Sequence, residues 1–174
     1  MDIKEALLEE HSKAQAQKII DYIGNDQVKL KELFRYFIGD NYRLSQRASW
    51  PISYVAENHP KLFRPYLKQM IQNLNKQNIH DAVKRNTIRI FATIPIPEQF
   101  QGEIYDLCYE FIFSVKEPVA VRCFSIGVIT KIADSNPELK PELDEAFMVL
   151  KEEKSAGIQS RLKHYYKKRK SATL

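Results

Sequence analysis

Four apolar positions recur four times along this chain at a nearly constant spacing. Leu143, Ala146, Phe147 and Leu150 lie at helical spacing, and stepping back by 39 residues and then twice by 37 gives apolar residues at all four positions. The earlier copies are Ile104, Leu107, Cys108 and Phe111, then Leu67, Met70, Ile71 and Leu74, then Leu30, Leu33, Phe34 and Phe37. Such a period indicates repeated units, each of which buries its apolar stripe against its neighbours.

The segment 117–150 shows what one unit contains. Val119, Ile126 and Ile129 give one apolar stripe at helical spacing, and the stripe that ends at Leu150 follows it. Between them, we expect Asn136 to cap the second helix, with the proline after it in the first turn, where no amide donor is needed. Each unit is therefore predicted to be a helical hairpin.

The spacing of apolar and turn residues predicts nine helices and no strand, so the chain is expected to be all-α. The first five expected helices cover about 3–23, 27–38, 42–57, 60–75 and 81–94. A sixth ends near Ser114, two lie within 117–150, and the last follows Gly157, which we expect to break the chain.

Composition limits the class of protein. A chain of 174 residues with 44% apolar side chains can bury a core, and no run is long enough for a membrane span. The start lacks a signal-peptide core, and Cys108 and Cys123 both fall in apolar helical patterns. We therefore expect a single domain over 1–174 in the cytoplasm.

The net charge of +5 is local. Residues 161–170 hold six cations and no acid, so the rest of the chain carries −1, although 41–80 also lean basic. The basic end, 161–174, has two interpretations: its cations complement the dipole at the end of a capping helix, or they form a tail that binds an acidic partner or nucleic acid.

The repeat resembles HEAT or armadillo-type repeats over roughly 27–170. Its second helices open with Asp81-Ala82-Val83-Lys84-Arg85 and with Pro118-Val119-Ala120-Val121-Arg122, which are similar to the start of the second helix of a HEAT unit, whereas Ser45-Gln46-Arg47 keeps only the base. The resemblance implies a right-handed α-solenoid of about four HEAT-like helical hairpins. The helices at 42–57 and 81–94, the first helix within 117–150 and the last helix would line its concave side.

Bases and aromatic residues on these helices are the candidate partner-binding residues. Bases at corresponding positions would form a ladder, which either contacts a partner or pairs with acids near the turns, such as Asp40, Asp81 or Glu117. Two further bases lie outside the ladder, and the sole tryptophan, either a binding anchor or a core residue, lies one turn from a tyrosine. The full set is Arg43, Arg47, Trp50, Tyr54, Arg85, Arg89 and Arg122.

No catalytic, cofactor or metal motif is visible in the sequence. The histidines are scattered, and no glycine-rich phosphate loop occurs. We therefore expect a non-catalytic scaffold that binds a protein partner on its concave face. The alternative is a nucleic-acid-binding HEAT-like protein, remotely similar to the alkylpurine DNA glycosylases, although an Asn-Trp-Asp-like catalytic stretch is missing.

Overall fold

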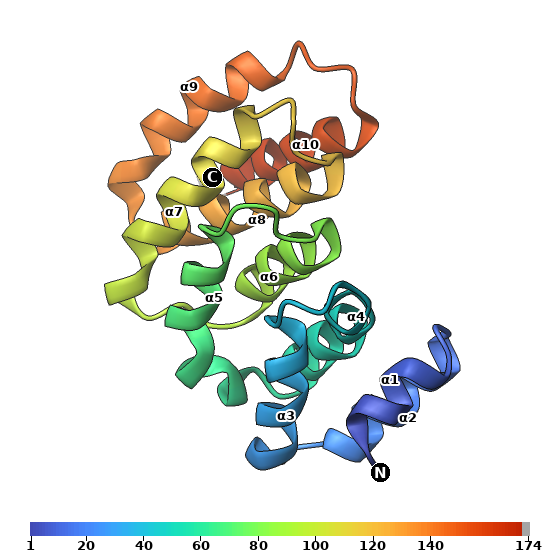
Figure 1. Ribbon diagram of the computed structural model, residues 1–174. Coiled ribbons are helices and arrows are strands. Elements are labelled where there is room, and N and C mark those ends of the chain that lie inside the picture. The colour runs from blue at the N-terminus through green and yellow to red at the C-terminus, as the bar shows by residue number, and fades with distance from the viewer. Residues whose placement is uncertain (172–174) are drawn as a thin grey trace. The chain divides into compact units, whose positions relative to one another are not determined.

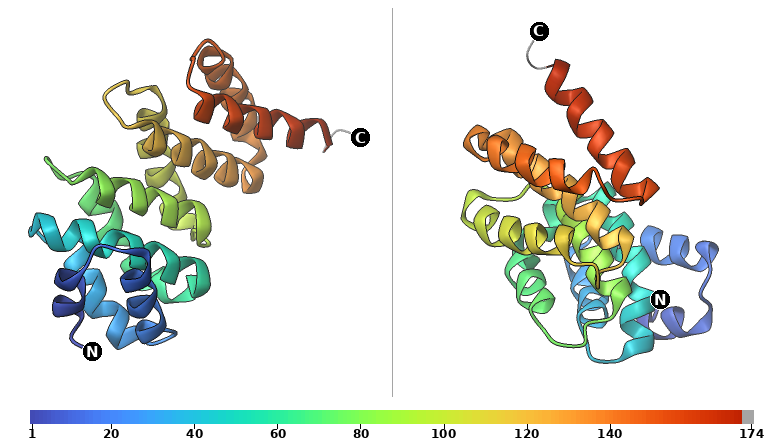
Figure 2. Two further views of the ribbon diagram at one scale, coloured as in Figure 1. Left: turned by 90° about the vertical axis from the view of Figure 1, so that its right-hand side faces the viewer. Right: turned by 90° about the horizontal axis from the view of Figure 1, so that it is seen from above.

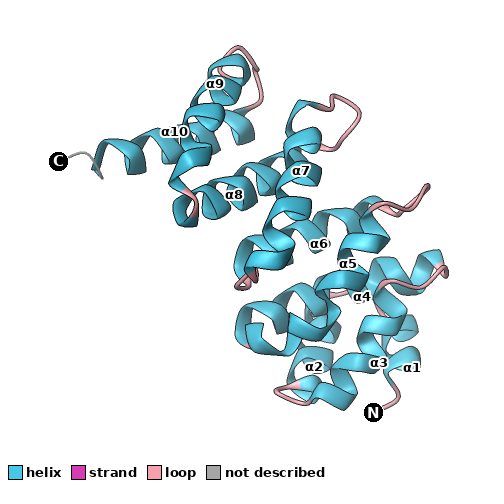
Figure 3. Cartoon of the chain, turned by 90° about the vertical axis from the view of Figure 1, so that its left-hand side faces the viewer, coloured by secondary structure: helices cyan, strands magenta, loops and turns pink. Residues whose placement is uncertain are grey.

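The computed structural model describes residues 1–171, and all regular structure in that range is helical (Figures 1 and 3). Two short 3-10 helices, η1 (Pro60–Tyr66) and η2 (Pro137–Leu139), accompany the α-helices. The α-helices are α1 (Ile3–Glu9), α2 (Lys13–Ile23), α3 (Gln27–Phe37), α4 (Tyr42–Asn58), α5 (Leu67–Leu74), α6 (Asp81–Thr93), α7 (Glu98–Phe113), α8 (Val119–Ser135), α9 (Lys140–Leu150) and α10 (Ala156–Ser171).

The predicted first helix is two helices. Glu10 is extended, with φ −146°, and the hydroxyl of Ser12 accepts a hydrogen bond from the backbone amide of Gln15 at the start of α2. A serine that can cap a new helix offers the backbone an alternative to continuing the old one. The single helix expected over 3–23 was therefore wrong.

Proline chemistry divides another predicted helix. The segment expected to form one helix over 60–75 consists of η1 followed by α5. Pro60 and Pro65 both lie in η1, and neither has an amide hydrogen to donate to an α-helical bond. The tighter 3-10 turn accommodates both prolines before α5 begins.

Two further local predictions were wrong. Asn136 ends α8 and makes no capping bond to the next helix; its Nδ2 donates instead to Gln101 Oε1 and to the Ile132 carbonyl, both at 2.8 Å. Gly157 does not break the chain, because it is the second residue of α10. A Cβ at this position would lie 3.0 Å from Cys123 Sγ, so the glycine permits close packing of α10 on α8.

The chain divides into two compact units, residues Met1–Pro95 and Ile96–Leu174. In unit 1, α4 packs against α1, α2, α3 and α6. The repeat positions of α3 and α5 are all buried, from Leu30 to Phe37 and from Leu67 to Leu74. This burial confirms the apolar face predicted for both helices.

Unit 2 contains the helices drawn from yellow to red in Figure 2. Its central helix, α8, contacts α7, α9 and α10. The repeat positions of α7 and α9 are also buried, except that Leu107 and Phe111 are only half-buried. Ile158, Leu162 and Tyr165 of α10 complete the core of this unit.

Hydropathy gives one further result. Within residues 1–171, no helix combines the length and the apolar character that crossing a bilayer requires.

Candidate functional site

The candidate residues of unit 1 lie on two helices that run in the same direction. At the start of both helices, the centres of the Tyr42 ring of α4 and the His80 ring lie 4.2 Å apart, and His80 is the residue that caps α6. Near their ends, the guanidinium carbon of Arg89 lies 4.8 Å from the centre of the Tyr54 ring. We call the two stripes of candidate side chains the α4–α6 face; they are Arg43, Arg47, Trp50 and Tyr54 on α4 and Arg85 and Arg89 on α6.

Arg89 contacts both an acidic and an aromatic side chain on this face. Its Nε and Nη2 donate to the same oxygen of Glu57 at 3.1 and 2.5 Å, while its guanidinium covers Tyr54. Hydrogen bonding by the Trp50 side chain and then by Arg89 lowers the pKa of the Tyr54 hydroxyl. Arg89 therefore has an acidic partner of its own, and Glu57 is a member of the site that sequence reasoning missed. Its position one turn after Tyr54 was the available signal.

Arg47 binds the backbone of another helix. Its Nη1 lies 2.9 Å from both the Leu7 and Leu8 carbonyl oxygens, near the end of α1. The last carbonyls of a helix have no partner inside that helix, and a cation complements the negative end of its dipole. In this structure, Arg47 fixes α1 against α4.

Arg43 and Arg85 differ from these two bases. Both are exposed, and neither has a polar or aromatic partner within residues 1–171. Trp50 is half-buried, with its ring centre 6.4 Å from that of Tyr54. The α4–α6 face therefore combines two available guanidiniums with a partly exposed aromatic pair.

Arg122 lies in unit 2 and is 5% exposed. Its Nε donates to the Ile112 carbonyl at 2.9 Å, and Nη1 and Nη2 donate to the two carboxylate oxygens of Glu153. The acids that the sequence suggested as partners for these bases lie near the turns, and they did not include Glu153, which follows α9. Arg122 thus makes its strong hydrogen bonds inside its own unit.

Titratable groups give no metal centre in the part of the chain that the structure describes, since no three His, Cys, Asp or Glu side chains lie close enough to share an ion. Burial raises the pKa of the Cys108 thiol to about 12 and lowers that of the Lys131 ammonium to about 8. A thiol with such a pKa is a poor nucleophile near neutral pH.

Comparison with known proteins gives one match. The family model described as HEAT repeat domain matches residues 3–169, which extends the resemblance to the first helix. No curated protein and no solved structure matches the chain. The match agrees with the paired helices and the repeated burial, and it confirms the predicted all-α solenoid. The chain belongs to the HEAT repeat domain family.

Proposed function

We propose that this protein is a non-catalytic HEAT repeat scaffold that binds an acidic segment of a protein partner on the α4–α6 face. The observation that supports this most directly is the contrast between four arginines on one surface. Arg47 and Arg89 are bound to carbonyls and to Glu57, whereas Arg43 and Arg85 are exposed without partners in the described chain. Unpaired guanidiniums can each take a carboxylate in a two-pronged hydrogen bond.

The aromatic pair adds contact area between these bases. Trp50 and Tyr54 are of the types that, together with arginine, dominate binding energy at protein interfaces. Arg89 and Glu57 hold Tyr54 in place, so part of this surface is ordered before a partner arrives. An acidic peptide would meet fixed aromatic rings flanked by positive charge.

The other predicted site residues have supporting roles in this proposal. Arg47 would hold α1 in place behind the face, and Arg122 would fix α8 inside unit 2. The free thiols of Cys108 and Cys123 favour a reducing compartment, and we propose the cytoplasm.

A second candidate function, nucleic-acid binding, is favoured by the basic end. Lys163, Lys167 and Lys170 are exposed on α10. Phosphate contacts by lysine would give binding without base preference and with steep salt dependence. The first proposal is preferred because the α4–α6 face also offers the aromatic pair.

The experiment compares partner recovery by the wild type, by Arg43→Glu/Arg85→Glu and by Lys61→Glu/Lys68→Glu. Both variants make the same charge change at exposed positions, the second on η1 and α5. A partner of the α4–α6 face is lost with the first variant, retained with the second and rich in Asp and Glu where it is cross-linked. Equal recovery of every protein by all three chains would contradict the proposal.

A further inference from the structure

The start of α6 is held by the imidazole of His80. Its Nδ1 accepts a hydrogen bond from the Ala82 amide at 2.8 Å, and its backbone carbonyl accepts from the Val83 and Lys84 amides at 2.9 and 3.0 Å. Serine, threonine, aspartate and asparagine are the usual caps, and their oxygens accept such a bond throughout the neutral range of pH. An imidazole nitrogen accepts one only while it carries no proton. This cap therefore depends on the protonation state of its side chain.

The capping bond defines that state in the folded chain. Because Nδ1 is the acceptor, the neutral ring carries its one proton on Nε2. Nε2 is buried and has no hydrogen-bond partner in the described chain, so the protein offers a charged ring no acceptor at this atom. A second proton would lie on Nδ1 and face the Ala82 N–H, so two donors would meet. Protonation is therefore incompatible with the capping bond.

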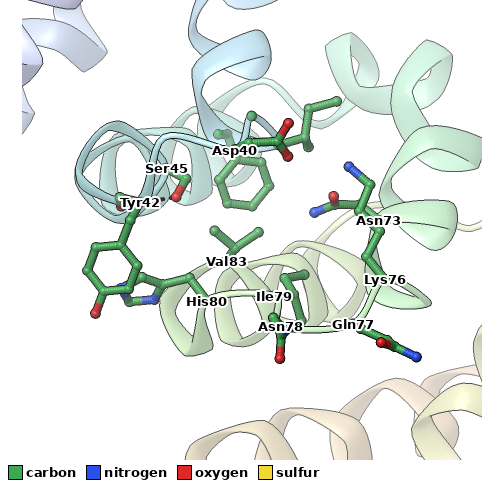
Figure 4. Close-up of a pocket in the computed structure, with 13 residues that line it drawn as sticks. Asp40, Tyr42, Ser45, Asn73, Lys76, Gln77, Asn78, Ile79, His80 and Val83 are labelled. Carbon is green, nitrogen blue, oxygen red and sulfur yellow. Dashed lines mark hydrogen bonds between the residues drawn. The ribbon is translucent and has the colours of Figure 1, made fainter.

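Tyr42 offers the ring a second position. The centres of the Tyr42 and His80 rings lie 4.2 Å apart, with their planes at 44°, and Figure 4 shows the two rings side by side. The face of a tyrosine ring attracts a cation placed over it. Tyr42 is 67% exposed, so a charged His80 ring turned along it would also reach water. The charged ring thus has a favourable place outside the cap.

Charged and titratable groups of both signs surround His80 on every element beside it. They are Asp40 in the turn before α4, Tyr42 and Arg43 at the start of α4, Lys76 after α5, and Asp81 and Lys84 on α6. The two carboxylates and the tyrosine face favour a charged imidazole, whereas the three cations oppose it. Neither sign predominates, so the capping bond is the main difference between the two states of the ring.

We propose that His80 is a proton-sensitive cap, which anchors the first turn of α6 when it is neutral and leaves that turn for the face of Tyr42 when it is protonated. Imidazole is the side chain that changes charge between about pH 5 and 8, so mild acid operates such a device. The stabilisation by the cap is present at neutral pH and is lost as the pH falls. The inference does not depend on the proposed function, because the cap can be measured without a partner.

Nuclear magnetic resonance of the isotope-labelled full chain tests the state of the ring. At about pH 7.5, the imidazole nitrogen shifts should place the proton on Nε2. On acidification, the Ala82 amide signal should move together with the His80 ring signals. A proton on Nδ1 at the higher pH, or a ring that titrates while the Ala82 amide does not respond, would overturn the proposal from the wild type alone.

Amide exchange in the wild type and in His80→Asn measures the consequence for the helix. Asparagine caps with an oxygen that does not titrate in this range, so both chains should protect the Val83, Lys84 and Arg85 amides equally at about pH 7.5. At about pH 5.5, these amides should exchange about fivefold faster in the wild type than in the variant, which is the usual effect of losing one cap. Comparison at matched pH removes the intrinsic pH dependence of exchange.

Two further variants localise the effect. His59 ends α4 and makes no capping bond with its side chain, so His59→Asn should keep the acid response of the wild type. Tyr42→Leu removes the second position of the ring, so it should move the response to lower pH. The same pH dependence in the wild type and His80→Asn, or an unchanged response in Tyr42→Leu, would contradict the proposal. Since the ring and the Ala82 amide are followed in the wild type, a poorly folded variant does not protect it.

Discussion

Arg122 holds both carboxylate oxygens of Glu153, which lies 31 residues later in the chain, with Nη1 at 3.2 Å from one of them. The same guanidinium donates through Nε to the Ile112 carbonyl. One buried side chain thus joins the end of α7, the start of α8 and the segment after α9. The hydrogen bond from Arg122 also lowers the pKa of Glu153 below its usual value of 4.5.

Glu153→Gln should reduce the free energy of unfolding of unit 2 by about 1–2 kcal/mol near neutral pH, because the charged hydrogen bonds become neutral ones. A carboxylate with a lowered folded-state pKa stabilises the fold above about pH 4.5, and this contribution is lost as the pH falls through the folded-state pKa. The variant should therefore lose less stability than the wild type in acid. Urea unfolding across that range measures this, with the exposed Glu152→Gln as the control. Parallel acid profiles for wild type and Glu153→Gln would contradict the role of the pair.

Arg47→Ala should loosen α1. It removes two hydrogen bonds from a charged donor to the Leu7 and Leu8 carbonyls, a loss of about 1.5–3 kcal/mol. Amide hydrogen exchange should rise most in α1. Arg43→Ala, one turn earlier on α4 and exposed, removes the same charge and should leave exchange unchanged. Similar exchange in both variants would show that the carbonyl contacts do not hold α1.

Replacing either of two glycines in unit 2 by alanine should change the stability of the chain, in opposite directions for the two positions. Gly127→Ala in α8 places a methyl group where no atom lies within 4 Å, so helix propensity should stabilise the chain by about 0.5–1 kcal/mol. Gly157→Ala would meet Cys123 Sγ at 3.0 Å and Val119 Cγ1 at 3.5 Å, so it should destabilise the packing of α10 on α8. Thermal unfolding of both variants tests the pair, and a stabilised Gly157→Ala would show that the contact can relax.

Two truncations distinguish the roles of the basic end. Deleting 167–174, of which 172–174 lie outside the described residues, removes partly exposed ion pairs from Lys168 to Asp134 and from Arg169 to Asp144, and should cost no more than about 1 kcal/mol. Deleting everything from Ile158 onward removes two buried side chains, Ile158 and Leu162. The free energy of unfolding should then fall by several kcal/mol, at ~25 cal/mol per Å² of apolar area that is no longer buried. Thermal unfolding measures both.

The same truncations test the nucleic-acid alternative. Fluorescence anisotropy with labelled duplex and single strands at about 50 mM and 200 mM salt would show any phosphate binding as a steep loss of affinity. If the shorter deletion leaves melting unchanged and abolishes such binding, the end is a functional tail and the capping interpretation is wrong. No binding by the full chain at low salt would exclude this alternative.

Periodic burial was predictable from sequence because one apolar stripe per helix leaves few ways to remove it from water. Only Leu107 and Phe111 of the repeat positions are not fully buried. Local exceptions were harder to predict. The helix break before Ser12 depends on one hydroxyl, and the place of Gly157 depends on a sulfur atom of another helix.

The helices that carry the candidate residues were predictable from the sequence, whereas the hydrogen-bond partners of those residues were not. Arg43 and Arg85 are exposed on neighbouring helices, but the partner of Arg122 is Glu153, whose position depends on how the chain returns after α9.

The placement of two side chains gives each compact unit its own spectroscopic or chemical reporter. Trp50, the sole tryptophan, lies in unit 1, so fluorescence excited at the red edge, where tryptophan absorbs and tyrosine does not, observes that unit alone. Cys108 is fully buried in unit 2, so its reaction with a thiol reagent requires that unit to open. Coincident denaturation curves from the two signals would mean that both units melt as one cooperative block, and separated curves would give each unit its own unfolding free energy.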